Sequence, residues 1–252
     1  MNTNTSQGFT RFTPASIRKW LRFGWRAFTE SSFISIAYAS IFCIVGAGAA
    51  IWLAVSERLL LFVALAGGFM LIAPVFVTGY YNVAQMLREG KSPIFDDIIA
   101  SFRANPAGIL GIGAFVTLVF MIWMADAAMI YGVVAEKMSS ASADGKGAGT
   151  MMFLLLGAGM GALLAFIIYT ATVFSLPDAF YRKTGVGQAM VLSVKGVLYN
   201  LDVMLLWAVV LTLLTFGMLV ALPLIIVLFP ILGYASYAAY LDLIGELPSE
   251  SD

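Results

Sequence analysis

Histidine is absent from the 252 residues of this chain, cysteine occurs once, and only 11% of the residues are charged. Without histidine, the chain lacks the common ligand of haem and copper sites and the usual general base for a serine or cysteine nucleophile. The single cysteine, Cys43, excludes an internal disulfide and a zinc site built from cysteine alone. We therefore expect no cofactor, no metal site and no enzymatic activity.

The scarcity of charge also excludes an ordinary soluble domain, in which about a quarter of the residues are charged. Hydrophobic residues make up 61% of the chain, and the mean hydropathy is +0.95. Such a surface is suited to lipid, so the composition indicates an integral membrane protein. The formal net charge is zero, so we expect no nucleic acid as a partner.

Six long apolar stretches define the predicted fold class, an all-α helical membrane bundle forming one domain over residues 1–252. A bilayer core of about 30 Å requires roughly 20 helical residues per crossing. The predicted spans are residues 33–54, 59–81, 107–131, 151–176, 202–219 and 223–242. The first stretch is too long for an ordinary signal peptide, and we expect it to be retained. A polar loop is expected over 136–149, a tight turn near 217–223 and a polar tail over 243–252.

The positive charges predict the orientation of these spans. Of the 14 Lys and Arg residues, eleven fall on the amino-terminal segment and on the second and fourth connections. The three on the opposite side are Arg58, Lys137 and Lys146. Because cytoplasmic loops carry the excess of Lys and Arg, both termini are predicted to be cytoplasmic and the protein to lie in the inner membrane.

The amino-terminal segment, residues 1–30, contains an amphipathic pattern that starts near Thr13 and Pro14. Apolar residues recur at helical spacing on one face, and cations occupy the other. We predict a helix at the cytoplasmic membrane surface, with its aromatic side in the acyl boundary and its cations among anionic headgroups. It serves either as a topology anchor or as a lipid sensor. Its predicted membrane-surface residues are Arg18, Lys19, Trp20, Arg22, Trp25 and Arg26.

Two further cytoplasmic connections, residues 93–104 and 187–199, also have apolar stripes at helical spacing. Each precedes a pair of predicted spans, as the amino-terminal helix does. The chain is therefore either three copies of an interfacial helix followed by a hairpin, or an irregular bundle that only resembles one.

Few residues within the predicted spans suggest a specific role. Asp126 is the acid placed inside a span, and Pro74 and Pro230 interrupt helical hydrogen bonding. These three would form a polar or transport site, or else Asp126 is an interfacial group and the prolines only shape helices. Gly157 and Gly161 form a small-residue motif that favours helix packing, within one chain or between copies.

Several segments together resemble the bacterial family called domain of unknown function 2189, described as predicted integral membrane proteins. They include Gly24–Phe28, Gly90 to Pro93 with Asp97, Phe102–Pro106, Ser175–Pro177, and Pro230 through Asp242, with Gly68, Pro74 and Gly79 between them. The resemblance implies a six-span inner-membrane protein and no particular activity. In the family the last span carries histidines where Tyr234 and Ala238 stand here, so a metal or haem role through them does not carry over.

The function expected from the sequence is that of a non-enzymatic membrane protein, an accessory or assembly factor that acts by packing with lipids, with other membrane proteins or with itself. A small-solute or ion transporter is the alternative, and Asp126, Pro74 and Pro230 would matter most for it.

The eleven-to-three distribution of cations makes the topology testable. Reporter fusions at Ser142 and after Asp252 should report opposite sides of the membrane, with Ser142 outside. The same side for both fusions would contradict the six-span arrangement.

Overall fold

The computed structural model describes residues 8–55, 75–104, 106–140 and 143–247. The described part of the chain is helical and contains no strand. In chain order its helices are α1 (Pro14–Glu30), α2 (Ser32–Val55), α4 (Gly79–Arg88), α5 (Phe95–Ala104), α6 (Pro106–Ser140), α7 (Ala143–Thr172), α8 (Ser175–Tyr181), α9 (Val186–Tyr199), α10 (Leu201–Val220), the short 3-10 helix η1 (Leu222–Leu224) and α11 (Ile225–Leu243). The all-α fold class is confirmed.

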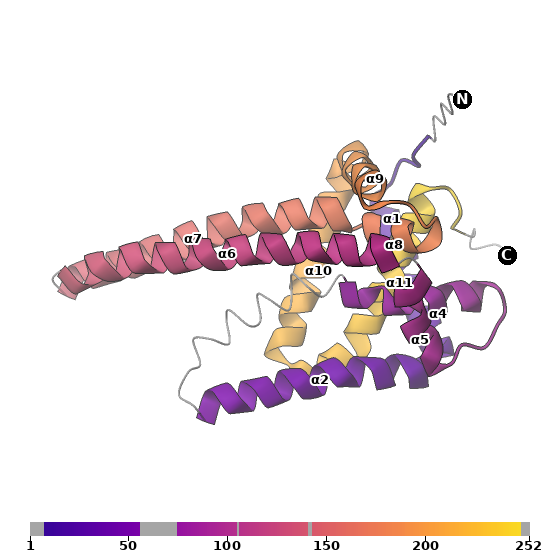
Figure 1. The fold of residues 1–252 in the computed structure, drawn as a ribbon, viewed down its shortest axis with the longest axis horizontal. Coiled ribbons are helices and arrows are strands. Elements are labelled where there is room, and N and C mark those ends of the chain that lie inside the picture. The colour runs from indigo at the N-terminus through magenta and orange to yellow at the C-terminus, as the bar shows by residue number, and fades with distance from the viewer. Residues whose placement is uncertain (1–7, 56–74, 105, 141–142, 248–252) are drawn as a thin grey trace.

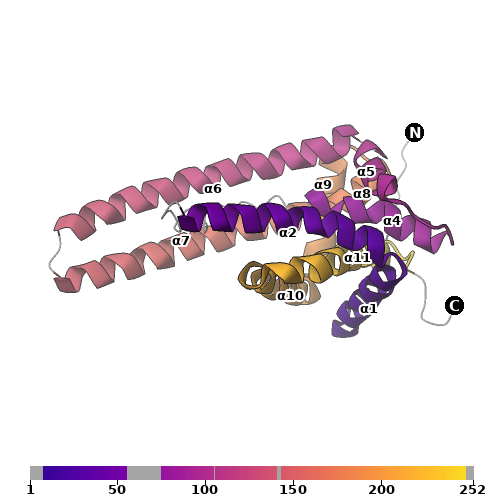
Figure 2. The same ribbon diagram turned by 90° about the horizontal axis from the view of Figure 1, so that it is seen from below.

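The short helices gather at one end of the molecule, and the long helices project from it (Figure 1). We call this end the cap and define it as α1, α4, α5, α8, α9 and the second half of α11. From the cap extend α2, the hairpin of α6 and α7, and the hairpin of α10 and α11, as the perpendicular view also shows (Figure 2). The first and last described segments both lie at the cap, because the backbone N–H of Thr10 donates to the carbonyl of Leu243 at 3.1 Å.

Five helical segments among the described residues are long and apolar enough to cross a membrane. They are Ser32–Trp52, Ala107–Asp126, Leu155–Tyr181, Leu201–Val220 and Leu222–Leu243. These agree with five of the six predicted spans. Most of the remaining predicted span, 59–81, lies outside the described residues, and its last three residues begin α4.

The prediction of a polar loop over 136–149 is wrong for most of these residues, which are helical. Helix α6 continues to Ser140 and α7 starts at Ala143, so the hairpin projects well beyond an ordinary membrane crossing. Half of this segment consists of good helix formers, three Ala, two Lys, one Glu and one Met, and the helices extend into it although it also contains three Gly and three Ser. Polarity therefore marks where the apolar span ends and does not mark where the helix ends.

The fourth predicted span, 151–176, is broken near its end, and a proline explains the break. Helix α7 ends at Thr172 and α8 starts at Ser175. Pro177 has no N–H to donate to the carbonyl of Val173, so a continuous helix would lack that bond. In the first turn of the new helix α8, the missing donor costs little. The tight turn expected near 217–223 is confirmed, because α10 ends at Val220 and η1 contains Pro223.

Helix α11 is the centre of the structure. It packs against α1, α2, α4, α8 and α10, and 72% of its span is buried within the protein, against 22–39% for the other four. Small residues allow this crowding. At Gly233, for example, a Cβ atom would come within 2.8 Å of the Tyr80 ring of α4. Tyr234, Tyr237 and Tyr240 of α11 are fully buried and build an aromatic core with Tyr80 and Tyr81.

Helix α1 forms where the amphipathic pattern predicts it, and its start is confirmed. Thr13 and Ser16 form a capping box, with Pro14 at the first helical position. Its apolar face, however, packs on α11. Ile17, Trp20, Gly24, Ala27 and Phe28 are buried in the protein, so the prediction that this aromatic side enters the acyl boundary is wrong for Trp20 and Phe28.

The crossing of α1 and α11 depends on the absence of a side chain at Gly24. A Cβ atom there would overlap the Ile231 carbonyl oxygen and lie 3.2 Å from the Cβ of Ala235. Because the first neighbour is backbone, it has little room to move. The two helices can therefore approach this closely only with glycine at position 24.

Gly24→Ala should lower the stability of the protein by roughly 1–3 kcal/mol, because the methyl group forces α1 away from α11. The matched control is Gly187→Ala, at an exposed position of α9 where a Cβ meets nothing within 4 Å. That change should leave stability unchanged or raise it by up to about 1 kcal/mol. Thermal unfolding in detergent measures both, and equal melting temperatures for the two variants would contradict the close crossing.

Candidate functional site

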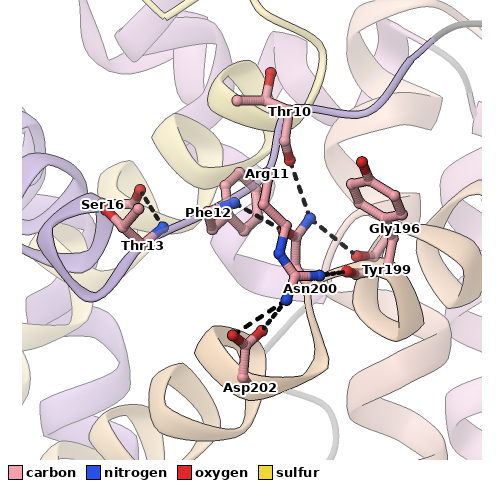
Figure 3. A network of polar contacts seen from close by, with 9 residues as sticks. All are labelled: Thr10, Arg11, Phe12, Thr13, Ser16, Gly196, Tyr199, Asn200 and Asp202. Atoms are coloured by element: carbon pink, nitrogen blue, oxygen red, sulfur yellow. Dashed lines mark hydrogen bonds and ion pairs between the residues drawn. The ribbon is translucent and has the colours of Figure 1, made fainter.

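The amide of Asn200 holds the amino-terminal strap, residues 8–13, against the cap (Figure 3). Its Oδ1 accepts the backbone N–H of Phe12 at 2.8 Å, and its Nδ2 donates to the carbonyl of Thr10 at 3.1 Å. An amide side chain offers one acceptor and two donors, so it pairs with an extended backbone much as a neighbouring strand would. Asn200 is fully buried and lies at the break between α9 and α10.

Arg11 also binds the strap to the break between α9 and α10 (Figure 3). Its guanidinium donates to the Tyr199 carbonyl and lies 3.3 Å from the Asp202 carboxylate. Both charged side chains are more than half exposed, so this ion pair contributes little on its own. The buried amide of Asn200 is the stronger contact. The sequence pattern marks Asn200 only as the end of a helix and does not reveal this role.

A buried carboxylate joins α8 to α11. Asp178 is 1% exposed and accepts hydrogen bonds from the Tyr240 hydroxyl at 2.8 Å and the Thr184 hydroxyl at 2.5 Å. The Arg182 guanidinium lies 3.8 Å away. These contacts fix α8 against α11 and against the segment before α9. Asp178 therefore has a structural role, which is to hold neighbouring helices together.

Three hydroxyl groups form a further buried cluster where α1 meets α2. The Tyr234 hydroxyl lies 3.0 Å from Ser31 Oγ and 2.7 Å from Ser35 Oγ, and the two serine oxygens are 3.1 Å apart. Tyr234 occupies a position where the resemblance to the family implies histidine. Here the group is neutral, and each hydroxyl is hydrogen-bonded within the protein. Among the described residues no cluster of three His, Cys, Asp or Glu side chains could hold a metal.

The surface of the cap carries a shallow recess between α1 and the end of α11. It is lined by Thr13, Ala15, Ser16, Arg18, Lys19, Arg22 and Asp242. Trp20 Nε1 donates to Asp242 Oδ2 at 2.9 Å, and Lys19 Nζ lies 3.5 Å from Asp242 Oδ1. The buried indole therefore holds the carboxylate in place beside the recess. Trp20 belongs to the core of the cap and is not a membrane-surface residue.

The other predicted membrane-surface residues remain on the outside of α1. Arg18, Arg22 and Arg26 are exposed, and the Trp25 side chain is 55% exposed. Arg26 Nε pairs with Glu30 Oε1 at 2.8 Å, one turn along the same helix. Contact of these residues with lipid stays a prediction.

Two of the three residues predicted for a transport site, Asp126 and Pro230, lie on separate hairpins. Asp126 lies on α6, partly exposed, at the last residue of the span Ala107–Asp126. Pro230 is buried inside α11, on another hairpin. Pro74 lies outside the described residues. Asp126 and Pro230 therefore lie on different helices that belong to different hairpins. Their joint role in transport stays a prediction.

The glycine motif of α7 has one partner within the described structure. A Cβ at Gly161 would meet Trp123 Nε1 of α6 at 3.4 Å, whereas a Cβ at Gly157 would meet nothing within 4 Å. Gly161 thus contacts the neighbouring helix of its own hairpin. Packing through Gly157, against another chain or otherwise, stays a prediction.

Over part of its length the chain is similar to a family of predicted integral membrane proteins. The family model DUF2189, described as predicted integral membrane protein, matches residues 60–178. The resemblance found in the sequence is thereby confirmed over this range, from the second predicted span to Asp178 in α8. The segments around Gly24 and Pro230 lie outside it. No curated protein and no solved structure matches the chain.

Asn200→Ala should release the strap, because it leaves the Phe12 N–H and the Thr10 carbonyl without their partners. The Phe12 N–H is buried, and leaving such a donor unsatisfied costs about 1–3 kcal/mol. Limited trypsin digestion, read by mass spectrometry, should then show faster cleavage after Arg11.

The matched control is Asn82→Ala, which removes a 2.9 Å bond to the Asp97 carbonyl and does not touch the strap. Cleavage after Arg11 should be unchanged in this variant. Equal cleavage rates in the parent protein and Asn200→Ala would show that the amide does not hold the strap.

Proposed function

We propose that the protein crosses the inner membrane six times, with both termini in the cytoplasm. The hydrogen bond between Thr10 and Leu243 supports an even number of crossings, because it joins the two ends of the described chain at the cap. Five candidate spans lie in the described residues, and the predicted span 59–81 is the sixth in this proposal. The excess of Lys and Arg on the cap side favours a cytoplasmic cap.

Within that topology, the protein acts as a non-enzymatic accessory factor that binds lipids or other membrane proteins through the sides of its projecting helices. The exposure of these helices is the observation that carries this proposal. In the four candidate spans other than that of α11, the share buried within the protein ranges from 22% to 39%. Large apolar side chains are exposed along α10, including Val209, Leu213, Phe216 and Val220. Surfaces of this kind are available to lipid tails and to neighbouring transmembrane helices.

The position of the polar groups also supports an accessory role over transport. Asn200 and Asp178 are buried in the cap, and each has hydrogen-bonding partners in the protein. The recess described above also opens at the cap, at the end of the span Leu222–Leu243. A transporter needs a binding site near the middle of the membrane.

Transport is the second candidate because Asp126 is the one charged residue of the apolar span Ala107–Asp126. If the protein moved a cation or a proton, this carboxylate would be placed to bind it near the outer side. Asp126→Asn, which is nearly isosteric and neutral, distinguishes the two functions.

For an accessory factor, Asp126→Asn should change stability by about 1 kcal/mol or less, because the amide keeps part of any hydrogen bonding. Cells that carry only the variant should retain full function. The measurements are thermal unfolding in detergent together with growth and solute flux of those cells. A stable, inserted variant that has lost flux or growth would instead favour transport.

A further inference from the structure

Helix α9 has small residues on its inner face and large apolar residues on its outer face. Its buried residues are Ala189, Ser193, Gly196 and Val197, three of which have a small side chain or none. Its exposed face carries an apolar stripe, which we define as Val191, Val194 and Leu198. These three residues are spaced by three and four positions and are 37–58% exposed. A helix that faces water shows the opposite pattern, with polar side chains outside.

Polar and amphipathic residues line one edge of the apolar stripe. Gln188, Lys195 and Tyr199 are exposed and follow one another at intervals of seven and four residues, so they share that edge. The outer face of α9 is therefore divided lengthwise into an apolar half and a half that carries a cation and a phenol. This division is typical of a helix that lies between acyl chains and headgroups, where Lys and Tyr direct their polar ends to the headgroups.

The two ends of α9 contact helices near the points where their spans begin or end. At its start, the Val186 side chain fills the space that a Cβ atom of Gly111 would occupy. Gly111 is five residues after the start of α6, or about 8 Å along that helix. Towards its other end, Gly196 packs on Leu243, where a Cβ atom would come within 2.8 Å of the leucine side chain. Leu243 is the last residue of the span Leu222–Leu243.

The middle of α9 is fixed where α7 ends. Ser193 Oγ donates to the Thr170 carbonyl at 2.7 Å and accepts the Phe174 N–H at 3.1 Å. These two bonds flank Thr172, the last residue of α7. Helix α9 thus packs at the cap end of the α6–α7 hairpin (Figure 1). Its contacts with α6, α7 and α11 place it at the depth where these three helices enter or leave the apolar region.

The apolar surface of α9 continues onto a membrane span. Only Asn200 separates α9 from α10, and Leu201 and Leu205 are the next exposed apolar residues. The exposed side of α10 then continues through Val209 and Leu213 along the span Leu201–Val220. Lipid that surrounds this span therefore also meets the outer face of α9.

We propose that α9 lies in the cytoplasmic boundary of the bilayer, with its apolar stripe among the acyl chains and Lys195 among the headgroups. The partner of this surface is the lipid bilayer. The inference rests on the proposed topology, in which the cap lies at the cytoplasmic surface of the membrane. It gives α9 the position that the sequence pattern predicts for the aromatic face of α1, which packs on α11 instead.

Spin-label accessibility in liposomes tests the position of α9. Full-length single-cysteine proteins carry the label through Val194→Cys, Leu198→Cys or Gln188→Cys, in a Cys43→Ser background that keeps a donor near the Leu222 carbonyl. All three labelled positions are exposed, so the label should not disturb folding. Oxygen concentrates among acyl chains, whereas a nickel chelate stays in water. The ratio of oxygen to nickel collisions should be severalfold higher at positions 194 and 198 than at position 188.

Val209→Cys is the matched control, because Val209 is exposed on the span of α10 and should meet oxygen wherever that span crosses the membrane. An oxygen-rich label at 209 with nickel-rich labels at 194 and 198 would overturn the position of α9 alone. Few collisions of either kind at 194 and 198 would also overturn it, by showing that protein covers this face. A nickel-rich label at 209 would instead contradict the proposed membrane crossing itself.

Discussion

The close approach of α1 to α11 at Gly24 is the contact on which the cap depends. Once the Ile231 carbonyl lies against Gly24, Trp20 reaches Asp242 and Ser31 reaches Tyr234. The strap before α1 then lies beside the break between α9 and α10, where Asn200 binds it. One missing side chain thus allows three polar contacts. Two of them join α1 and its end to the last helix, α11, and the third joins the strap to the break between α9 and α10. The projecting helices emerge from an end that is held together by these contacts.

The bilayer makes the spans predictable from the sequence, because every crossing needs a long apolar run whatever its neighbours are. The end of the α10–α11 hairpin could be placed as well, since Pro223 ends the helical pattern there. Helix α1 could be located but its surroundings could not. An apolar stripe such as Ile17, Trp20 and Phe28 has the same period whether it faces lipid or another helix. Only the three-dimensional arrangement shows that α11 covers it.

Some candidate site residues could likewise be identified from the sequence, and others could not. Arg18 and Arg22 are identifiable from the cationic face of an amphipathic pattern, and they do line the recess. Asn200 and Asp178 could not be singled out, because polar residues at helix ends usually serve only as caps or topology signals. Their roles come from partners distant in the chain, Phe12 for Asn200 and Tyr240 for Asp178. Hydropathy and local spacing carry no information about such contacts.

The packing of α1 on α11 buries Trp20 within the cap, and fluorescence quenching by brominated lipids measures this burial. Two single-tryptophan proteins are needed, one retaining Trp20 and one retaining Trp25, with the other tryptophans replaced by phenylalanine and both reconstituted with brominated lipids. The structure predicts strong quenching of Trp25, which is 55% exposed, and little quenching of Trp20, which is fully buried. Equal quenching of the two would show that the apolar face of α1 lies in the membrane, contradicting its packing on α11.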